Sequence, residues 1–399
     1  AGSSLATNQC CAKIPWTEFY NRIPPKADGV DGSRSRHLGA KVVVVINHEQ
    51  EEPSTMNIST IGLDLAKNVF QVHGIDDTGK VIVRRSLRRR QVLPLFGKLE
   101  PCLIGMEACG TSHFWARALQ ALGHEVKLMP PIYVTPYVKR GKTDAGDAAA
   151  ICEAVTRPTM RFVAIKSAEQ QSILALHRTR ALLVRQRTQL INMIRAQLAE
   201  FGFVLATGIQ HALKLVDQLV EGRAPDIPAL ACKIVISLAE QIRALQARIA
   251  TLEEDMKSWF RGNELAKRLK TIPGIGFITA SALAASVTDP HQFTSGRQFA
   301  ASLGLTPKAD CSGDKQRMGR ISKMGDRYLR RLLVNGMTSQ LQAARRKPEA
   351  HPWVTRLLAS KPNKLVAVAM ANKAARIAWV VMTRGEVYRA HHPITEATA

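Results

Sequence analysis

Acidic residues are scarce in this sequence. Against 56 Lys and Arg, the 399 residues include only 32 Asp and Glu, so the formal net charge at pH 7 is +24. A folded protein with such an excess is suited to a polyanion, because each phosphate that it neutralises releases condensed counterions. The composition therefore predicts nucleic acid as the first partner.

Long apolar runs are also lacking. The longest extends from Leu365 to Ala371, whereas about 18 apolar residues are needed to cross a bilayer. Hydrophobic residues still make up 46% of the chain, which is enough to build two or three domains with a real core. We therefore expect neither a membrane protein nor a disordered chain.

Cysteine is infrequent and irregularly placed. The seven cysteines form no C-x-x-C pair and no Cys/His spacing typical of zinc ligands, which argues against a disulfide framework and a structural zinc site. The first residues also lack the basic-then-apolar pattern of a secretory signal. These absences favour a protein of the reducing cytoplasm.

Residues 1–55 differ from the rest of the chain. They hold six basic and six acidic residues, so the whole positive excess lies from Met56 onward. They are rich in Gly and Ser, contain Pro24-Pro25 and show no sustained period, which is typical of a poorly ordered segment. We predict that residues 1–55 are a non-native or disordered extension and that Met56 is the natural start; a short folded module is the alternative.

Residues 56–165 predict an α/β domain. Short β-rich runs with alternating apolar residues come first, and strands alternating with helices follow, a pattern typical of a mixed sheet covered by helices. The expected elements are a three-stranded meander at 57–64, 68–75 and 80–86, a strand at 102–106, a helix at 112–122 and a strand at 125–129.

Residues 166–262 predict long helices. Apolar residues from Leu238 to Trp259 are spaced 4, 3, 4, 3, 4, 3, and those from Ile173 to Ile194 follow a similar seam, which favours an antiparallel or intermolecular coiled coil. Helices that pack only on their own chain are the alternative. Arginines crowd the rest of the first helix and are predicted phosphate contacts: Arg178, Arg180, Arg185 and Arg187.

Residues 263–385 predict a second globular unit, mainly α, followed by a tail at 386–399. The unit opens on L-K-T-I-P-G-I-G, which resembles the hairpin of a helix-hairpin-helix, where Gly274 and Gly276 would let backbone N–H groups face a phosphate. An ordinary Pro-Gly turn is the alternative. Residues 304–331 have a net charge of +5. Their predicted phosphate contacts are Lys315, Arg317, Arg320, Lys323, Arg327 and Arg330.

Four acids stand where a metal site could form. Asp64 and Glu107 each close a predicted strand, and strand ends are where open α/β sheets place their sites. Asp144 and Asp147 share one face of a helix that starts near Thr143. Carboxylates suit Mg²⁺ or Mn²⁺, and two such ions about 4 Å apart can clamp a phosphodiester. Each acid could instead be a helix cap or a solvated charge.

Several motifs together resemble the Piv-like DEDD transposases of bacterial insertion sequences, in the family's order and over residues 57–385. They are I-G-L-D-L-A-K, G-M-E-A-C-G, K-T-D-A-G-D-A, I-P-G-I-G, and L-G-L-T-P-K followed by S-G and I-S-K-M-G-D-R-Y-L-R. The resemblance implies a RuvC-like domain of RNase H fold that carries the D-E-D-D acids. These correspond to Asp64, Glu107, Asp144 and Asp147, with Lys142 beside them as a further phosphate contact.

The resemblance also assigns a role to Ser312. A loop serine before a glycine is ordinarily a turn residue, and the neighbouring Cys311 is a rival nucleophile; the family, however, places its catalytic serine in this S-G motif. It further implies a bridge RNA that pairs with donor and target DNA, leaving the protein to contact backbone and shape. The residues alone do not show this, since aromatics are only 5% of the chain.

The sequence thus predicts a DNA transposase or recombinase with a DEDD metal site and the serine nucleophile Ser312. We expect it to bind element-end and target DNA and a guide RNA, and to form a dimer or tetramer in which one protomer's serine completes another's metal site. Two alternatives remain open: a metal-dependent nuclease of the Holliday-junction resolvase type that uses water, and a non-catalytic nucleic-acid-binding protein.

Overall fold

The computed structural model describes residues 57–139, 143–221, 227–312 and 315–389. The predicted extension at residues 1–55, Lys142 and the tail beyond Arg389 lie outside these ranges, and so do the side chains of residues 310–312 and 315–317.

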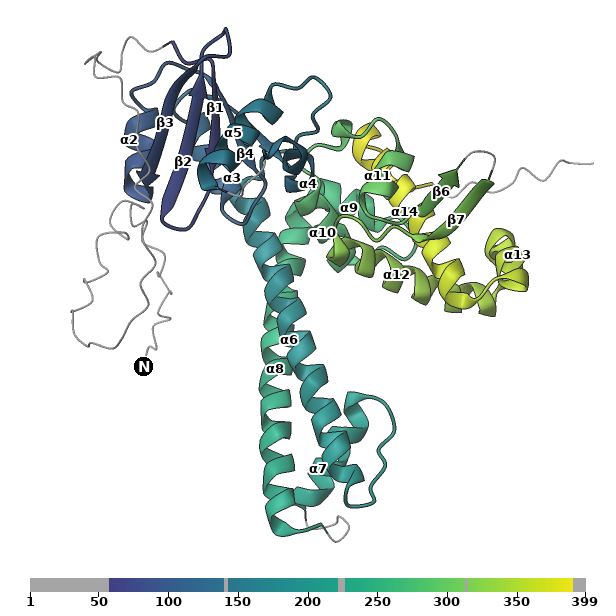
Figure 1. Ribbon diagram of the computed structural model, residues 1–399. Coiled ribbons are helices and arrows are strands. Elements are labelled where there is room, and N and C mark those ends of the chain that lie inside the picture. The colour runs from purple at the N-terminus through teal and green to yellow at the C-terminus, as the bar shows by residue number, and fades with distance from the viewer. Residues whose placement is uncertain (1–56, 140–142, 222–226, 313–314, 390–399) are drawn as a thin grey trace, which may run out of the picture. The chain divides into compact units, whose positions relative to one another are not determined.

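A mixed five-stranded sheet forms the first part of the described chain (Figure 1). Its strands are β1 (Thr60–Asp64), β2 (Val69–Ile75), β3 (Val81–Arg88), β4 (Leu103–Glu107) and β5 (Glu125–Met129), in the order β3-β2-β1-β4-β5. The first three strands pair antiparallel as a meander, whereas β4 is parallel to both β1 and β5. The predicted meander and mixed sheet are confirmed, and the architecture is consistent with an RNase H-like fold.

Helices cover both faces of this sheet. Ile61 and Leu63 of β1 belong to a buried cluster with residues of α2 (Val92–Phe96) and α3 (Ser112–Gln120). Gly62, which lies between them, faces the opposite way and contacts α5 (Asp144–Val155), as expected because successive strand residues point to opposite faces. The second cluster joins α5 with Met129 and with Val134 of α4 (Pro131–Val134). Short 3-10 turns η2 (Arg89–Gln91) and η3 (Thr135–Tyr137) link these elements.

Two long helices follow, α6 (Ala168–Ala199) and α8 (Ala229–Gly262), with α7 (Ile209–Val220) between them. α6 and α8 lie side by side (Figure 1) and run antiparallel, because Glu169 bonds to Trp259 while Arg180, further along α6, bonds to the earlier Glu253. Ser167 caps α6 by accepting a hydrogen bond from the Gln170 backbone N–H.

The predicted seam of α8 packs on its own chain. Ile242, Ile249 and Met256 are buried, and the remaining seam residues are half-buried: Leu238, Leu245, Leu252 and Trp259. The antiparallel pairing that the spacing favoured is therefore present within the chain. Intermolecular assembly through these helices stays a prediction.

The rest of the described chain is mostly helical, as predicted. Its helices are α9 (Glu264–Lys270), α10 (Phe277–Ser286), α11 (Gly296–Ser302), α12 (Arg327–Arg346), α13 (Pro352–Ser360) and α14 (Asn363–Arg384), with 3-10 turns η4 (Pro290–Gln292) and η5 (Pro348–Ala350). One buried cluster joins α9 through α12 with α14. α9 and α10 lie on either side of the turn that holds Gly274, and its helix-hairpin-helix character stays a prediction.

A two-stranded hairpin interrupts these helices. It consists of β6 (Pro307–Ser312) and β7 (Lys315–Ile321), which pair antiparallel. The prediction of a polar loop around Ser312 was wrong for the residues up to Ser312, which continue β6 to its end. The error arose because K-A-D-C-S and K-Q-R-M-G-R hold few β-branched or aromatic residues, so local composition carries little strand signal.

α14 is the one helix among the described residues that is long and apolar enough to span a bilayer by length and composition alone. Its small residues Ala371, Ala374, Ala375 and Ala378 are instead buried in the cluster with α9 through α12. A helix that packs this way has the apolar composition that a domain core requires, which makes its hydropathy weak support for a membrane span.

Candidate active site

Two of the predicted acids meet at one edge of the sheet. Asp64 is the last residue of β1 and Glu107 the last residue of β4. The strands are parallel neighbours, with Leu63 opposite Met106 in the register, so both chains bring their final residue to the same edge. Both carboxylates are half-buried there.

The other two acids come from the first turn of α5. Thr143 is the N-cap of this helix, and its Oγ1 accepts a hydrogen bond from the Gly146 backbone N–H at 3.1 Å. Such a cap fixes where the helix begins. Asp144 is therefore the first helical residue and Asp147 follows one turn later, the former exposed and the latter half-buried.

Two strand glycines let α5 approach the sheet closely. A Cβ at Gly62 would overlap the Ala148 carbonyl oxygen and lie 2.5 Å from the Cys152 backbone N, and one at Gly105 would lie 2.8 Å from Val155 Cβ. Any side chain at either position would push the helix outward. The glycines thus bring the first turn of α5 next to the ends of β1 and β4.

Two of the four acids have raised pKa values. Burial, and then the charges of Asp147 and Asp144, raise the pKa of Asp64 above its ordinary value. Burial, and then the charges of Asp64 and Asp147, raise the pKa of Glu107. Carboxylates that share one site repel each other in this way. A cation placed among them would relieve the repulsion.

The donor set fits a hard divalent cation. Half-buried carboxylates from three elements supply oxygen ligands of the kind that Mg²⁺ and Mn²⁺ prefer. As the side chains stand, no three carboxylate, imidazole or thiol groups among the described residues are close enough to hold one ion. The fit therefore lies in donor chemistry and mutual repulsion rather than in finished coordination geometry.

Ser312 lies on a different element, at the end of β6. Its backbone pairs with that of Lys315, the first residue of β7, so the serine stands at the turn end of the hairpin. Arg317 and Arg320 follow on β7, and Arg320 is exposed. The structure thus places the predicted nucleophile beside basic residues of the same hairpin.

The basic residues that follow the hairpin differ in exposure and in their hydrogen bonds. Lys323 is exposed and adopts a positive φ of 55°, and Arg327, the first residue of α12, is also exposed. Arg330 is different, because its guanidinium donates hydrogen bonds to the carbonyl oxygens of Leu303 (2.8 Å) and Met324 (3.0 Å). Arg330 therefore holds the loop that precedes α12.

The arginines of α6 divide in the same manner. Arg178 and Arg185 are exposed and Arg187 is half-buried. Arg180 is half-buried and forms an ion pair with Glu253 of α8, with Nη2 2.5 Å from Oε1. Arg180 thus joins α6 to α8, an arrangement that its position among exposed arginines did not predict.

The two glycines of the α9–α10 turn also differ. Gly274 has a φ of +83°, and a Cβ there would overlap the Met337 side chain of α12. Its need for glycine is explained by a tight turn packed against a neighbouring helix. Gly276 is the N-cap of α10, and a Cβ there would meet nothing within 4 Å. Of the two, Gly276 is the one open to a phosphate.

Sequence reasoning missed a buried polar group. His177 on α6 is 1% exposed and hydrogen-bonds through Nδ1 to the Tyr328 hydroxyl (3.0 Å) and through Nε2 to Ser281 Oγ (3.1 Å). Burial, and then the charge of Arg180, lower the pKa of His177 to about 4. The available signal was its spacing, four residues after Ile173 on the buried seam. Tyr328, which the histidine holds, is a packing residue.

Comparisons with known proteins find two matching family models and several similar proteins. A model of the Transposase IS116/IS110/IS902 family matches residues 266–352, and a transposase model for the DEDD domain of IS110-type elements matches residues 61–203. The chain is 48% identical to a protein named "Probable family 20 transposase" from Pseudomonas aeruginosa, over 84% of this chain and 99% of that protein.

Two further relatives are transposases of insertion sequences. The transposase for element IS1328 from Yersinia enterocolitica is 40% identical over 83% of this chain and 99% of its own length. The transposase for element IS1111A from Coxiella burnetii is 36% identical over 92% of this chain and 99% of its own length. The matches thus extend across both the sheet that carries the acids and the helices that surround Ser312.

Proposed function

This chain belongs to the Transposase IS116/IS110/IS902 family, and we propose that it cuts and rejoins DNA strands with its four clustered acids and a serine nucleophile. As a member of that family it is a transposase, a DNA strand-transfer enzyme of insertion sequences. The proposal concerns which residues carry out the transfer, and how.

The acids would hold the cation. Asp64, Glu107, Asp144 and Asp147 supply oxygen donors at one sheet edge, and the observation that carries the proposal is that they come together there from the ends of β1 and β4 and the first turn of α5. Burial, and then the charges of neighbouring carboxylates, raise the pKa of Asp64 and of Glu107. Bound Mg²⁺ or Mn²⁺ would neutralise charge on the oxygens of the phosphodiester under attack. We assign these four residues to metal binding in a RuvC-like domain.

Ser312 would be the nucleophile. Its Oγ attacks phosphorus, the bond between phosphorus and the leaving nucleotide's oxygen breaks, and that oxygen takes up a proton as the serine hydroxyl gives one up. The product is a phosphoserine diester, so the number of phosphate ester bonds is unchanged. A hydroxyl of another DNA strand can then reverse the step, which rejoins DNA without an outside energy source. Exposed Arg320 and Arg327 are suited to hold the phosphates nearby.

A guide RNA and a homo-oligomer, dimer or tetramer, complete the proposal. The net charge of +24 suits a polyanion such as RNA, and exposed Arg178 and Arg185 on α6 offer further phosphate contacts. The acids and the serine lie on separate elements, so one protomer's Ser312 can complete another's metal site.

The test is a protein–DNA adduct. The full chain is incubated with element-end DNA, Mg²⁺ and the RNA flanking the element, and the products are separated on a denaturing gel. We expect an adduct that disappears in Ser312→Ala and in Asp64→Asn, and that requires the RNA. Cleavage without an adduct would instead support the water-using resolvase mechanism, with Ser312 only structural.

Assembly has its own test. Ser312→Ala and Asp64→Asn are mixed at several ratios, each inactive alone. Active sites formed in trans would restore part of the activity, with a maximum at an intermediate ratio. An absence of rescue at every ratio would contradict the composite site and leave the chemistry of each residue to the adduct experiment.

A further inference from the structure

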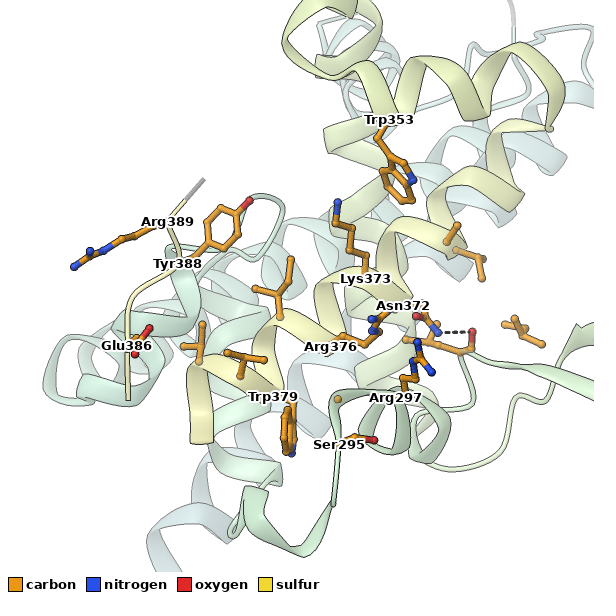
Figure 2. A pocket seen from close by; sticks show the side chains of 18 of the residues that line it. Ser295, Arg297, Trp353, Asn372, Lys373, Arg376, Trp379, Glu386, Tyr388 and Arg389 are labelled. Atoms are coloured by element: carbon orange, nitrogen blue, oxygen red, sulfur yellow. Dashed lines mark hydrogen bonds between the residues drawn. The ribbon is translucent and has the colours of Figure 1, made fainter. Parts of the chain in front are cut away.

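A groove with a volume of about 1500 Å³ lies on the C-terminal helical region (Figure 2). One side of α14 forms its longest wall, and the start of α11, Trp353 of α13, the base of the β6–β7 hairpin and residues 386–389 form the rest. Pockets for small molecules typically have volumes of roughly 300–1,000 Å³. The groove is therefore suited to an extended ligand.

The charge of the groove favours an anion. It is lined by four cationic side chains, Arg297, Lys373, Arg376 and Arg389, against the single acid Glu386. In the part of the chain that the structure describes, none of the four cations takes part in an ion pair. Their charges are available to a bound anion, and they come from three separate segments.

The groove also has an apolar and aromatic lining. Half-buried Val368, Ile377 and Val380 line it together with Trp353, which is 39% exposed. Lys373 Nζ lies 4.5 Å from the centre of the Trp353 ring, so a cation and an aromatic surface stand together (Figure 2). A ligand that matches the cationic and the aromatic parts of the lining needs anionic groups along one side and flat apolar faces along the other.

An unpaired nucleic acid strand has this chemistry. Its phosphates can bind the cations while its bases stack on the aromatic ring and the apolar wall. In a duplex the bases are paired and stacked on each other, so a duplex would offer the groove only its phosphates. The combination of cations that form no ion pair with an exposed tryptophan thus favours a single strand over a double helix.

α14 separates this surface from the core. Lys373 and Arg376 are exposed and three residues apart, hence on one face of the helix. Ala371, Ala374 and Ala378 point the other way and are buried. The two cations therefore have no packing role on the core side of the helix, and substituting them leaves the core contacts intact.

The groove ends at the hairpin that carries Ser312. Pro307, the first residue of β6, and Ile321, the last residue of β7, both line it. β6 then runs from Pro307 to Ser312, a span of about 17 Å at roughly 3.3 Å per residue. The end of a bound strand that contacts Pro307 therefore lies about that far from the Ser312 backbone.

We propose that this groove binds an unpaired DNA strand at the base of the hairpin that carries Ser312, as the subsite that holds the strand leading to the cut. The inference rests on the proposed function, because it takes the DNA from the activity of the family and the reacting group from Ser312. It adds a strand-binding surface formed by Lys373, Arg376 and Trp353, none of which belongs to the predicted set of phosphate contacts.

The test is equilibrium binding without catalysis. The full chain in EDTA is titrated into a labelled single-stranded oligonucleotide of element-end sequence, and fluorescence anisotropy is measured at several salt concentrations. The double variant Lys373→Ala/Arg376→Ala should bind about tenfold more weakly, with the slope of log K against log salt reduced by about 1.4. Trp353→Leu should weaken binding by about tenfold with little change in slope.

Matched controls come from the same chain. Lys364→Ala removes an exposed cation of α14 that does not line the groove, and Phe201→Leu removes an aromatic of similar exposure, 40%, beyond the end of α6. Both should bind like the unchanged protein, to within about twofold, since surface substitutions away from a site have small effects. Thermal melting of each variant shows whether it is folded.

Three outcomes would overturn the inference. The first is that folded groove variants bind the single strand as tightly as the unchanged protein does. The second is that these variants lose affinity for duplex and single strand equally. The third is that they lose affinity for an RNA of the same sequence but not for the DNA. Ser312→Ala distinguishes this inference from the proposed function. It should bind the single strand normally while forming no adduct, whereas an adduct in Ser312→Ala would contradict the serine chemistry and leave the binding result standing.

Discussion

The acids lie on a packed sheet and helix, whereas the serine lies on an exposed hairpin. Asp64 and Glu107 end two central strands whose residues are mostly buried, and α5 is seated against those strands through Gly62 and Gly105. Ser312 ends a strand of a two-stranded hairpin whose described flanking residues Lys308, Ala309 and Met318 are exposed. A hairpin of two strands has little stability of its own.

The two supports differ in how firmly they hold the residues that they carry. Metal ligands must be held within narrow limits, which close packing of strands and helix supplies. A nucleophile that meets DNA on an exposed hairpin can instead adjust when the strand binds. We infer that the backbone that carries the acids is held in place before DNA arrives, whereas the serine is positioned by the DNA.

The largest expected effect is on activity at the acid site. Asp64→Asn keeps the shape of the side chain and removes its charge, so DNA cleavage should fall by at least about 10²–10³-fold, the scale for losing one preorganised electrostatic group. Because the Asp64 carboxylate is repelled by Asp147 and Asp144, the variant should also melt at a higher temperature than the unchanged protein in EDTA.

Magnesium provides the control for this prediction. Added Mg²⁺ should raise the melting temperature of the unchanged protein and have a smaller effect on Asp64→Asn, since a ligand stabilises only the state that binds it. Asp76→Asn is the matched variant, because Asp76 is an exposed turn acid whose pKa is lowered by its hydrogen bond to Thr78. Equal stabilisation by Mg²⁺ in both variants would contradict metal binding by Asp64.

Next in size is the effect of packing. Gly62→Val forces a side chain against the Ala148 carbonyl and the Cys152 backbone, so urea unfolding should show a loss of about 1–3 kcal/mol, the usual cost of overpacking. DNA cleavage should fall as well, because α5 carries Asp144 and Asp147.

The hairpin is the counterpart in the comparison. Met318 on β7 is 69% exposed, so Met318→Ala should change stability by less than about 0.5 kcal/mol. Gly262→Ala in α8, where a Cβ meets nothing within 4 Å, controls for glycine replacement as such. A loss of free energy of unfolding in Met318→Ala as large as in Gly62→Val would show that the hairpin and the sheet are equally rigid.

The third prediction concerns pH. The pKa of buried His177 is lowered to about 4 from an ordinary 6.5, so the folded state binds fewer protons than the unfolded chain between these values. Stability should therefore fall as the pH drops from about 6.5 towards 4, by up to about 3 kcal/mol from this group. Urea unfolding at pH 7.5, 6 and 5 measures the change.

Two variants separate the sources of this acid sensitivity. His177→Gln should flatten the pH dependence while retaining hydrogen-bonding capacity towards Tyr328 and Ser281. His113→Gln is the second variant, because the pKa of His113 is also lowered to about 4, by burial and then by Lys166. An unchanged pH dependence in His177→Gln would show that His177 is not held neutral in the folded chain.

The sheet and its acids could be predicted because their signals are local. Alternating apolar runs marked the strands to within a few residues, and Asp64 and Glu107 were placed at strand ends because each follows such a run. Asp144 and Asp147 follow the capping residue Thr143, whose role is also local. The role of Gly62 was not predictable, since it depends on a helix more than eighty residues later in the chain.

What could not be predicted depends on partners far along the chain. Arg330 donates hydrogen bonds to two backbone carbonyls, one before and one after the β6–β7 hairpin, and His177 is satisfied by residues from two other helices. No spacing in the sequence encodes those pairings. The hairpin around Ser312 was missed for a different reason, because the sequence of its strands is polar and lacks the apolar alternation by which the other strands were found.

The smallest expected effects distinguish two neighbouring arginines of α6. Arg180→Ala removes a partly buried ion pair with Glu253, so the free energy of unfolding should fall by about 0.5–1 kcal/mol. Arg178 is exposed, so Arg178→Ala should leave stability unchanged and reduce the slope of log K against log salt for DNA by about 0.9 if it contacts one phosphate. Urea unfolding and anisotropy titrations on the same two proteins measure both quantities. If the two effects were exchanged, Arg180 would leave Glu253 and hold a phosphate. α6 and α8 would then rearrange when nucleic acid binds. The long helices would in that case be adjustable, like the serine hairpin and unlike the packed backbone that carries the acids.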